Sequence, residues 1–199
     1  MDASESQVPE MLQALLEERF KLKVHRGNAN QEVFALVVAK GGLKVREAIA
    51  NSGIAAVEEP PASTSTFFGS VTTREIFGQT GRHSAAAISN PRMGTVIETN
   101  GANRLQRWEA PNITFEGLAD LLDKVMPLSS PVIDMTGLKG RYQLVLEVTI
   151  AGGDPTELDE SVLKAVNEGL RKLGLQLERR QGAVEILVVD YAAKTPSEN

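Results

Sequence analysis

The chain has 199 residues, of which 42% are hydrophobic but only 5% aromatic, so it can build an aliphatic core in one ordinary domain or two small ones. Its net charge of -5 argues against nucleic acid or an anionic membrane surface as a partner, because both need a basic face. The lack of cysteine excludes disulfides and thiolate chemistry, and no apolar run approaches the roughly 20 residues that span a bilayer. The acidic, polar start, MDASES, does not have the composition expected of a signal peptide.

The first 50 residues predict a helix that leads into a hairpin. Apolar side chains recur at helical spacing and should be buried: Met11, Leu12, Leu15, Leu16 and Phe20. Leu22–His25 alternates like a strand, and Gly27–Asn30 favours a turn because Gly and Asn tolerate left-handed backbone angles. Val33–Ala39 is almost entirely apolar, which is typical of a strand covered on both faces, and Gly41-Gly42 ends it.

Residues 51–100 predict an irregular connection that docks on the core, since apolar pairs such as Phe67-Phe68 do not suit a free linker. Thr72–Phe77 is expected to form a short helical turn, whereas Arg82–Ser89 has no clear assignment. Arg92–Thr99 should be a strand that pairs with Arg104–Glu109, because Asn100-Gly101 between them is a hairpin signal.

A second helix is expected after Asn112 or Thr114, either of which can cap it. Its apolar face consists of Leu118, Leu121, Leu122 and Val125, and Pro127 should end it. Two strand-like segments follow, Val132–Asp134 and Tyr142–Ile150. The turn between them contains Gly137 and Gly140, which we expect to permit positive φ angles.

A third helix is expected to begin at Asp154, with Asp159 or Ser161 as later alternatives. Its buried stripe would comprise Val162, Leu163, Val166, Leu170 and Leu173, and Gly174 would cap its C-terminus. Leu175–Glu178 and Val184–Asp190 then predict two strands on either side of an Arg180-Gln181-Gly182 turn.

The recurring order predicts an α+β fold of repeated helix–strand–strand units, with an antiparallel or mixed sheet and helices packed on one face. Residues 1–50 would form the first unit, 51–100 the connection and 101–199 the second and third units. They would make one continuous domain or two small similar subdomains. A true structural repeat and a chance likeness of aliphatic strands both explain the pattern. Val33–Val38 and Val184–Val189 should both lie in the shared interior.

Catalytic and metal signatures are weak. His25 and His83 are the only histidines, no Gly-x-Ser-x-Gly elbow surrounds a serine, and two histidines without cysteine leave too few zinc ligands. Gly41-Gly42 is too short for a phosphate loop. We therefore expect no catalytic residue, no metal and no cofactor, and favour a protein that is not an enzyme.

Two weaker candidates for binding remain. Arg104, Arg107 and Trp108 form a local basic–aromatic cluster, which suits an interface but also a strand edge with a half-buried Trp. Asp134 could bind a ligand or cation, although a carboxylate in this position more commonly accepts backbone N–H bonds within its own turn.

One stretch of the chain resembles a known family. Val132–Tyr142, VIDMTGLKGRY, is similar to the V-x-D-x-T-G-L-x-G-x-Y hallmark of an uncharacterised soil-associated bacterial family, expanded mainly in acidobacteria. Met11–Leu22, Val33–Gly42, Val188–Asp190 and the ending Pro196–Asn199 also resemble it, so the likeness covers most of the chain except about residues 45–100.

The resemblance implies an exported protein, sometimes joined to membrane metallopeptidases of the β-lactam-sensor type. It also implies a further N-terminal segment before the first helix, which this chain would lack. No activity is known for the family, so it assigns no catalytic residue.

These observations predict a non-enzymatic extracytoplasmic module that binds a peptide or another envelope protein, for example through an exposed strand edge. A carboxylate-dependent hydrolase of cell-wall or carbohydrate substrates is an alternative; it needs two carboxyls about 5 to 10 Å apart in a cleft. A sensory appendage of a membrane peptidase is a third reading, by family analogy alone.

Overall fold

The computed structural model describes residues 8–48, 65–66, 72–77, 84–90, 93–149 and 158–197. Over these residues it contains three α-helices and two sheets, which confirms the predicted α+β class. The chain divides into two compact units: unit 1 comprises residues 1–31 with 181–199, and unit 2 comprises residues 32–180.

Unit 1 contains helix α1 (Val8–Phe20), the first part of strand β1 (Lys23–Val38) and the last part of strand β10 (Leu175–Tyr191). The C-terminal segment returns to the end of α1, where the Ala193 N–H donates to the Phe20 carbonyl at 2.7 Å. Side chains also join the two strand segments, because His25 Nδ1 lies 2.8 Å from Asp190 Oδ2. Unit 1 is therefore assembled from opposite ends of the chain.

Both hairpins predicted from the two ends of the chain are wrong. β1 runs straight through Gly27–Asn30, and β10 runs straight through Arg180–Gly182. β1 and β10 instead pair with each other. The backbone N–H and C=O groups of each segment therefore find their hydrogen-bond partners on the other strand and not in a local turn. Gly27 does not adopt a positive φ; a Cβ there would lie 3.3 Å from Val188 Cγ2, so this glycine makes room for a neighbouring side chain.

Part of the expected burial is also wrong in unit 1. Met11, Leu12 and Leu15 on α1 are each more than half exposed, and so are Leu187 and Val189 on β10. β10 alternates half-buried and exposed residues here, as a strand with one covered face does. The physical reason is that two strands and one helix make too few layers to cover both faces of the strands. Side chains on the uncovered face therefore stay exposed.

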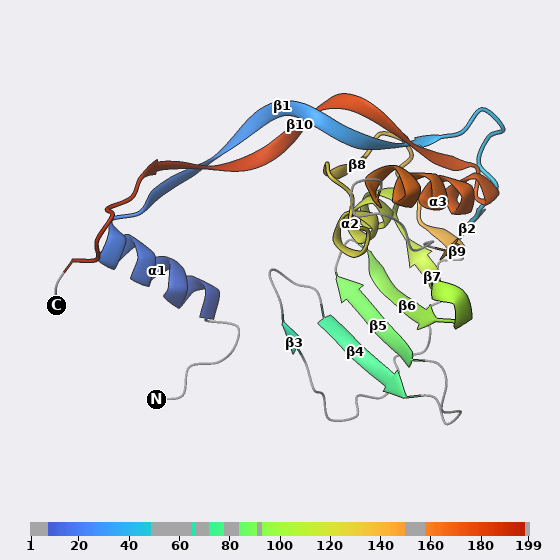
Figure 1. Ribbon diagram of the computed structural model, residues 1–199, viewed down its shortest axis with the longest axis horizontal. Helices are drawn as coiled ribbons and strands as arrows, with labels where there is room; N and C mark the ends of the chain where they lie inside the picture. Colours follow the sequence, from blue (N-terminus) through green and yellow to red (C-terminus); the bar gives the residue numbers. More distant parts are fainter. Residues whose placement is uncertain are drawn as a thin grey trace. The chain divides into compact units, whose positions relative to one another are not determined.

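Unit 2 contains a seven-stranded antiparallel sheet in the order β2-β9-β7-β6-β5-β4-β3 (Figure 1). Its strands are β2 (Arg46–Glu47), β3 (Ser65–Thr66), β4 (Thr72–Phe77), β5 (Ser84–Asn90), β6 (Gly94–Asn100), β7 (Leu105–Ile113) and β9 (Tyr142–Thr149). A three-stranded sheet has the order β10-β1-β8, where β8 is Val132–Asp134. β8 runs parallel to β1, with Phe34 opposite Val132 and Leu36 opposite Asp134.

The middle of the chain is more regular than the sequence predicted. β6 and β7 form the expected hairpin, with a short 3-10 turn at Ala102–Arg104 between them. Thr72–Phe77 is strand β4 and not a helical turn, because its β-branched residues pair with Ser84–Asn90, the segment left unassigned. Phe67 and Phe68 lie outside the described residues.

The two strands predicted after the second helix belong to different sheets. Val132–Asp134 joins β1 in the three-stranded sheet, whereas Tyr142–Thr149 joins β7 in the seven-stranded sheet. The turn over residues 135–141 therefore carries the chain from one sheet to the other. Val33–Val37 of β1, the central strand of the three-stranded sheet, is buried throughout, as predicted.

Helices α2 (Phe115–Val125) and α3 (Leu158–Lys172) supply the predicted apolar faces. The Thr114 side chain caps α2 by accepting from the Gly117 N–H at 3.0 Å, and α2 ends before Pro127. The proposed helix start at Asp154 lies outside the described residues. The fully or largely buried members of the two stripes are Leu118, Leu121, Leu122, Val162, Val166 and Leu170.

Within unit 2, α3 packs against the seven-stranded sheet and against the first part of β10. A Cβ added at Gly169 would lie 2.5 Å from the Glu147 carbonyl oxygen of β9, so the helix approaches that strand at its backbone. Two residues earlier on α3, Asn167 hydrogen-bonds to Leu177 of β10. α2 contacts β9 as well, since the Phe115 and Tyr142 rings stack with centroids 4.4 Å apart. Side chains from both sheets and both helices form one apolar cluster.

Candidate functional site

The predicted basic–aromatic cluster is not brought together. Trp108 is 1% exposed and faces the core from β7, whereas Arg107 is on the opposite face because successive strand residues alternate. Arg107 donates to Glu109 Oε1 at 2.8 Å and to Glu147, and these carboxylate hydrogen bonds raise the pKa of Arg107. Arg104 is exposed in the 3-10 turn at a φ of 59°.

The Asp134 carboxylate is used inside its own turn. Its Oδ1 accepts from the Thr136 N–H and from the Thr136 hydroxyl, both at 2.8 Å. The Thr136 oxygen in turn accepts from the Leu138 N–H at 3.2 Å. This turn connects the two sheets, so the Asp134 carboxylate stabilises the connection between them.

The two glycines of this turn are needed for different reasons. Gly137 adopts the expected positive φ, +72°, in open space. Gly140 does not, which corrects the prediction for that residue. A Cβ at Gly140 would instead lie 2.8 Å from the Tyr142 hydroxyl and 3.0 Å from its ring, which stacks on Phe115 and cannot easily move.

Of the two histidines, only His25 lies within the described residues. His25 pairs with Asp190 at an exposed position of unit 1, and His83 lies outside the described residues. Within the described part of the chain, no three His, Asp or Glu side chains gather closely enough to hold a metal ion. No helix in that same part is long and apolar enough to cross a membrane.

A pocket in unit 2 forms where the loop after β1 docks on the C-terminus of α3. The Ala39 N–H donates to the Gly174 carbonyl, and the Lys44 N–H donates to the Leu173 carbonyl, both at 2.9 Å. These bonds satisfy carbonyls that the end of a helix leaves free. Gly174 has a φ of +77°, which confirms the predicted cap, and its missing Cβ leaves space for Gly42.

This pocket, which we call the basic pocket, has a volume of about 300 Å³. Its charged lining residues are all cations, Lys40, Lys44 and Arg171, and its remaining lining consists of Ala39, Gly41, Gly174 and Gln176. None of the three cations forms a salt bridge with a carboxylate of the described residues. A chain with a net charge of -5 therefore gathers three positive charges around one hollow.

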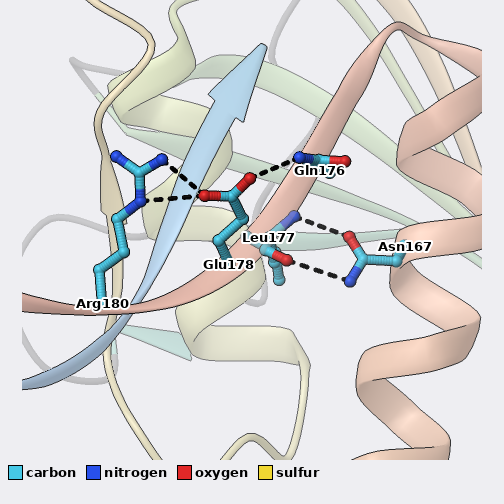
Figure 2. Close-up of polar contacts among 5 residues, drawn as sticks. All are labelled: Asn167, Gln176, Leu177, Glu178 and Arg180. Carbon is cyan, nitrogen blue, oxygen red and sulfur yellow. Dashed lines mark hydrogen bonds and ion pairs between the residues drawn. The ribbon is translucent and has the colours of Figure 1, made fainter. Parts of the chain in front are cut away.

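Glu178 is the acidic group next to this pocket, and it is engaged elsewhere (Figure 2). Arg180 donates to Glu178 Oε2 through Nε at 3.0 Å and Nη2 at 2.5 Å, while Gln176 Nε2 donates to Oε1 at 2.6 Å. The Arg180 hydrogen bonds, helped by Gln176 and the charge of Lys40, hold the pKa of Glu178 below its ordinary value. Glu178 thus orients the Gln176 amide, whose oxygen points away from it in Figure 2.

Asn167 fixes the strand that carries Gln176. Its side-chain Oδ1 accepts from the Leu177 N–H at 2.7 Å, and its Nδ2 donates to the Leu177 carbonyl at 3.2 Å (Figure 2). β10 is the outer strand of its sheet, so this amide takes the place that a further strand would occupy. The wall of the basic pocket is thereby tied to α3 by side-chain as well as backbone hydrogen bonds.

The sequence did not predict the basic pocket. Lys40 and Lys44 belong to a loop, and Arg171 follows about 130 residues later in a helix, so each looks like an ordinary solvated charge. The available signals were the Gly41-Gly42 turn and the Gly174 cap, which mark the two segments that dock.

A separate acidic group faces the core. Glu98 on β6 lies directly opposite Trp108, whose Nε1 has no hydrogen-bond partner among the described residues. Burial raises the pKa of Glu98. A raised pKa in the folded state means that ionisation opposes folding, so this cost is present at neutral pH and disappears in acid.

Glu98→Gln should therefore raise the Tm at pH 7 by about 1–2 °C, since partial exposure screens the effect. The gain should vanish near pH 3, where an unfolded-state Glu is almost fully protonated and the folded-state Glu98, with its raised pKa, is more so. Thermal unfolding followed by circular dichroism at the two pH values measures this, with Glu47→Gln at an exposed position of β2 as the control for charge removal. A gain of equal size at both pH values would contradict the explanation.

No curated protein and no solved structure matches the chain. One family model does, described as a protein of unknown function (DUF3738), and its match runs over residues 1–192. Over almost its whole length, therefore, the chain belongs to the DUF3738 family of proteins of unknown function.

Proposed function

We propose that this chain is a non-enzymatic binding module whose basic pocket takes an anionic group of its partner. The observation that carries the proposal is the convergence of Lys40, Lys44 and Arg171 on one pocket whose lining includes no carboxylate. Ammonium and guanidinium groups form charge-assisted hydrogen bonds to carboxylate or phosphate, and Arg can make two at once. At about 300 Å³ the pocket is at the small end of ligand sites, so it suits one anionic group.

A simpler explanation accounts for only part of this arrangement. Cations near a helix C-terminus stabilise the helix, which is sufficient for Arg171 in the last turn of α3. Lys40 and Lys44 are not on that helix; the docked loop brings them there at the cost of mutual repulsion. An anion in the basic pocket would relieve that repulsion.

Binding fits the lining better than catalysis does. Hydrolysis by two carboxyls needs an acid and a base in the same cleft, and the basic pocket has neither. Its polar groups are Lys, Arg, an amide and backbone, which hold and orient an anion.

The proposed setting is extracytoplasmic, with a peptide or another envelope protein as the partner. The resemblance of Val132–Tyr142 to a family of exported proteins supports this setting. Fractionation of native cells with an antibody against the chain tests it, and recovery in the cytoplasmic fraction would rule it out.

The binding proposal is tested by titrating the full chain with inorganic phosphate and with malonate at low salt, followed by amide NMR shifts. Shifts should concentrate at Lys40, Gly41 and Gly174, and Arg171→Gln should weaken binding about tenfold. Lys124→Gln is the matched control, because Lys124 occupies the last turn of α2 as Arg171 does that of α3. Equal affinities of the two variants, or shifts spread over the surface, would overturn the proposal.

A further inference from the structure

A second pocket of about 340 Å³ adjoins the basic pocket, and Lys44 lines both. It is bounded by Val45 and Arg46 on one side, by Leu144 and Val145 of β9 on the other, and by Gln143 and Leu173. Its lining thus combines cationic and apolar side chains next to a strand.

The second pocket lies where the ladder between β2 and β9 stops. Arg46 is opposite Gln143 and Glu47 is opposite Tyr142, so the next positions in register would place Lys44 opposite Val145. The Lys44 N–H instead donates to the Leu173 carbonyl, because the loop turns away to dock on α3. In the part of the chain that the structure describes, Val145 therefore has a neighbouring strand on one side, at Glu109 of β7, and none on the side of β2.

The Val145 backbone faces this gap. On one side of it the Arg141 carbonyl accepts from the Ala48 N–H, and on the other the Glu147 carbonyl points at α3, 2.5 Å from an added Gly169 Cβ. Backbone groups two residues apart point to the same side of a strand. The N–H and carbonyl of Val145 thus point toward the second pocket, and the residue is 38% exposed.

We infer that the partner is an extended acidic peptide segment, which adds to β9 at Val145 and places a carboxylate in the basic pocket. This inference rests on the proposed function and specifies its ligand. Backbone hydrogen bonds at Val145 would hold the segment as an added strand, as in other cases of strand addition. The four cations Lys40, Lys44, Arg46 and Arg171 line the two adjoining pockets and select acidic side chains by charge.

The experiment selects a phage library of random octapeptides on the full chain, then synthesises the selected peptides. Asp or Glu should be enriched at one position, and methylation of alternate peptide nitrogens should weaken binding at least about tenfold. The Val145 amide should shift on binding. Arg46→Gln should reduce affinity, while Lys139→Gln, at an exposed turn position, should not. Ligand methylation leaves the protein intact, so a folding defect cannot explain its effect.

Selected peptides without acidic enrichment, or insensitive to N-methylation, would overturn this inference. So would a failure to select any peptide. If phosphate and malonate still bind the basic pocket in either case, the proposed function stands and only the peptide assignment fails. If these anions do not bind, the proposed function fails too.

Discussion

Gly174→Ala is expected to destabilise unit 2 by about 3 kcal/mol or more and to abolish anion binding in the basic pocket. The φ of +77° alone costs an L-residue about 1–2 kcal/mol. The new Cβ would also collide with the Gly42 carbonyl oxygen and lie 2.8 Å from the Lys44 nitrogen. Both are backbone atoms of the docked loop, so relief requires the loop to leave α3 and take Lys40 and Lys44 with it.

The control for Gly174→Ala is Gly137→Ala. Gly137 has nearly the same φ, +72°, but an added Cβ meets nothing within 4 Å. Its substitution should cost only about 1–2 kcal/mol, from backbone strain, and should leave anion binding unchanged. Urea unfolding gives both free energies, and the phosphate titration gives both affinities. Similar losses in the two variants would show that the loop does not depend on the close approach at Gly174.

Sequence patterns predicted the parts of the fold whose causes are local. The α2 and α3 faces follow from apolar spacing, and the Thr114 and Gly174 caps follow from the next few residues. The turns predicted at Gly27–Asn30 and Arg180–Gly182 failed because each segment pairs with a strand from the other end of the chain. A local pattern contains no information about such a partner.

In the candidate site, too, some features follow from the local sequence and others depend on segments far away in the chain. Arg107 and Trp108 are neighbours in sequence, yet the alternation of side chains along a strand places them on opposite faces. The prediction of Arg104–Glu109 as a strand already implied this separation. The basic pocket could not have been predicted in this way. Lys44 meets Arg171 only because a loop docks on a helix end about 130 residues later in the sequence.

Asn167→Leu is expected to lower the free energy of unfolding by about 2–3 kcal/mol, because the partly buried N–H and carbonyl of Leu177 both lose their partner. Lys164→Leu, at an exposed position of the same helix, is the control and should change it by less than about 0.5 kcal/mol. Urea unfolding measures both variants. Equal effects would show that the Asn167 hydrogen bonds contribute nothing beyond helix packing.

Asn167→Asp distinguishes the contributions of the two Asn167 hydrogen bonds to stability, because only one of them depends on the protonation of the Asp. An ionised Asp keeps an acceptor for the Leu177 N–H but turns a negative oxygen toward the Leu177 carbonyl, so the variant should be unstable at pH 7. Protonation restores a donor, so its deficit relative to the parent should shrink as the pH falls through about 4. A released β10 edge would also pair with other chains, which light scattering would detect as association at pH 7 but not in acid. If the variant is as stable as the parent at both pH values, only the N–H acceptor at Asn167 matters to β10. A deficit that is the same at both pH values would contradict the role given to the donor bond to the Leu177 carbonyl.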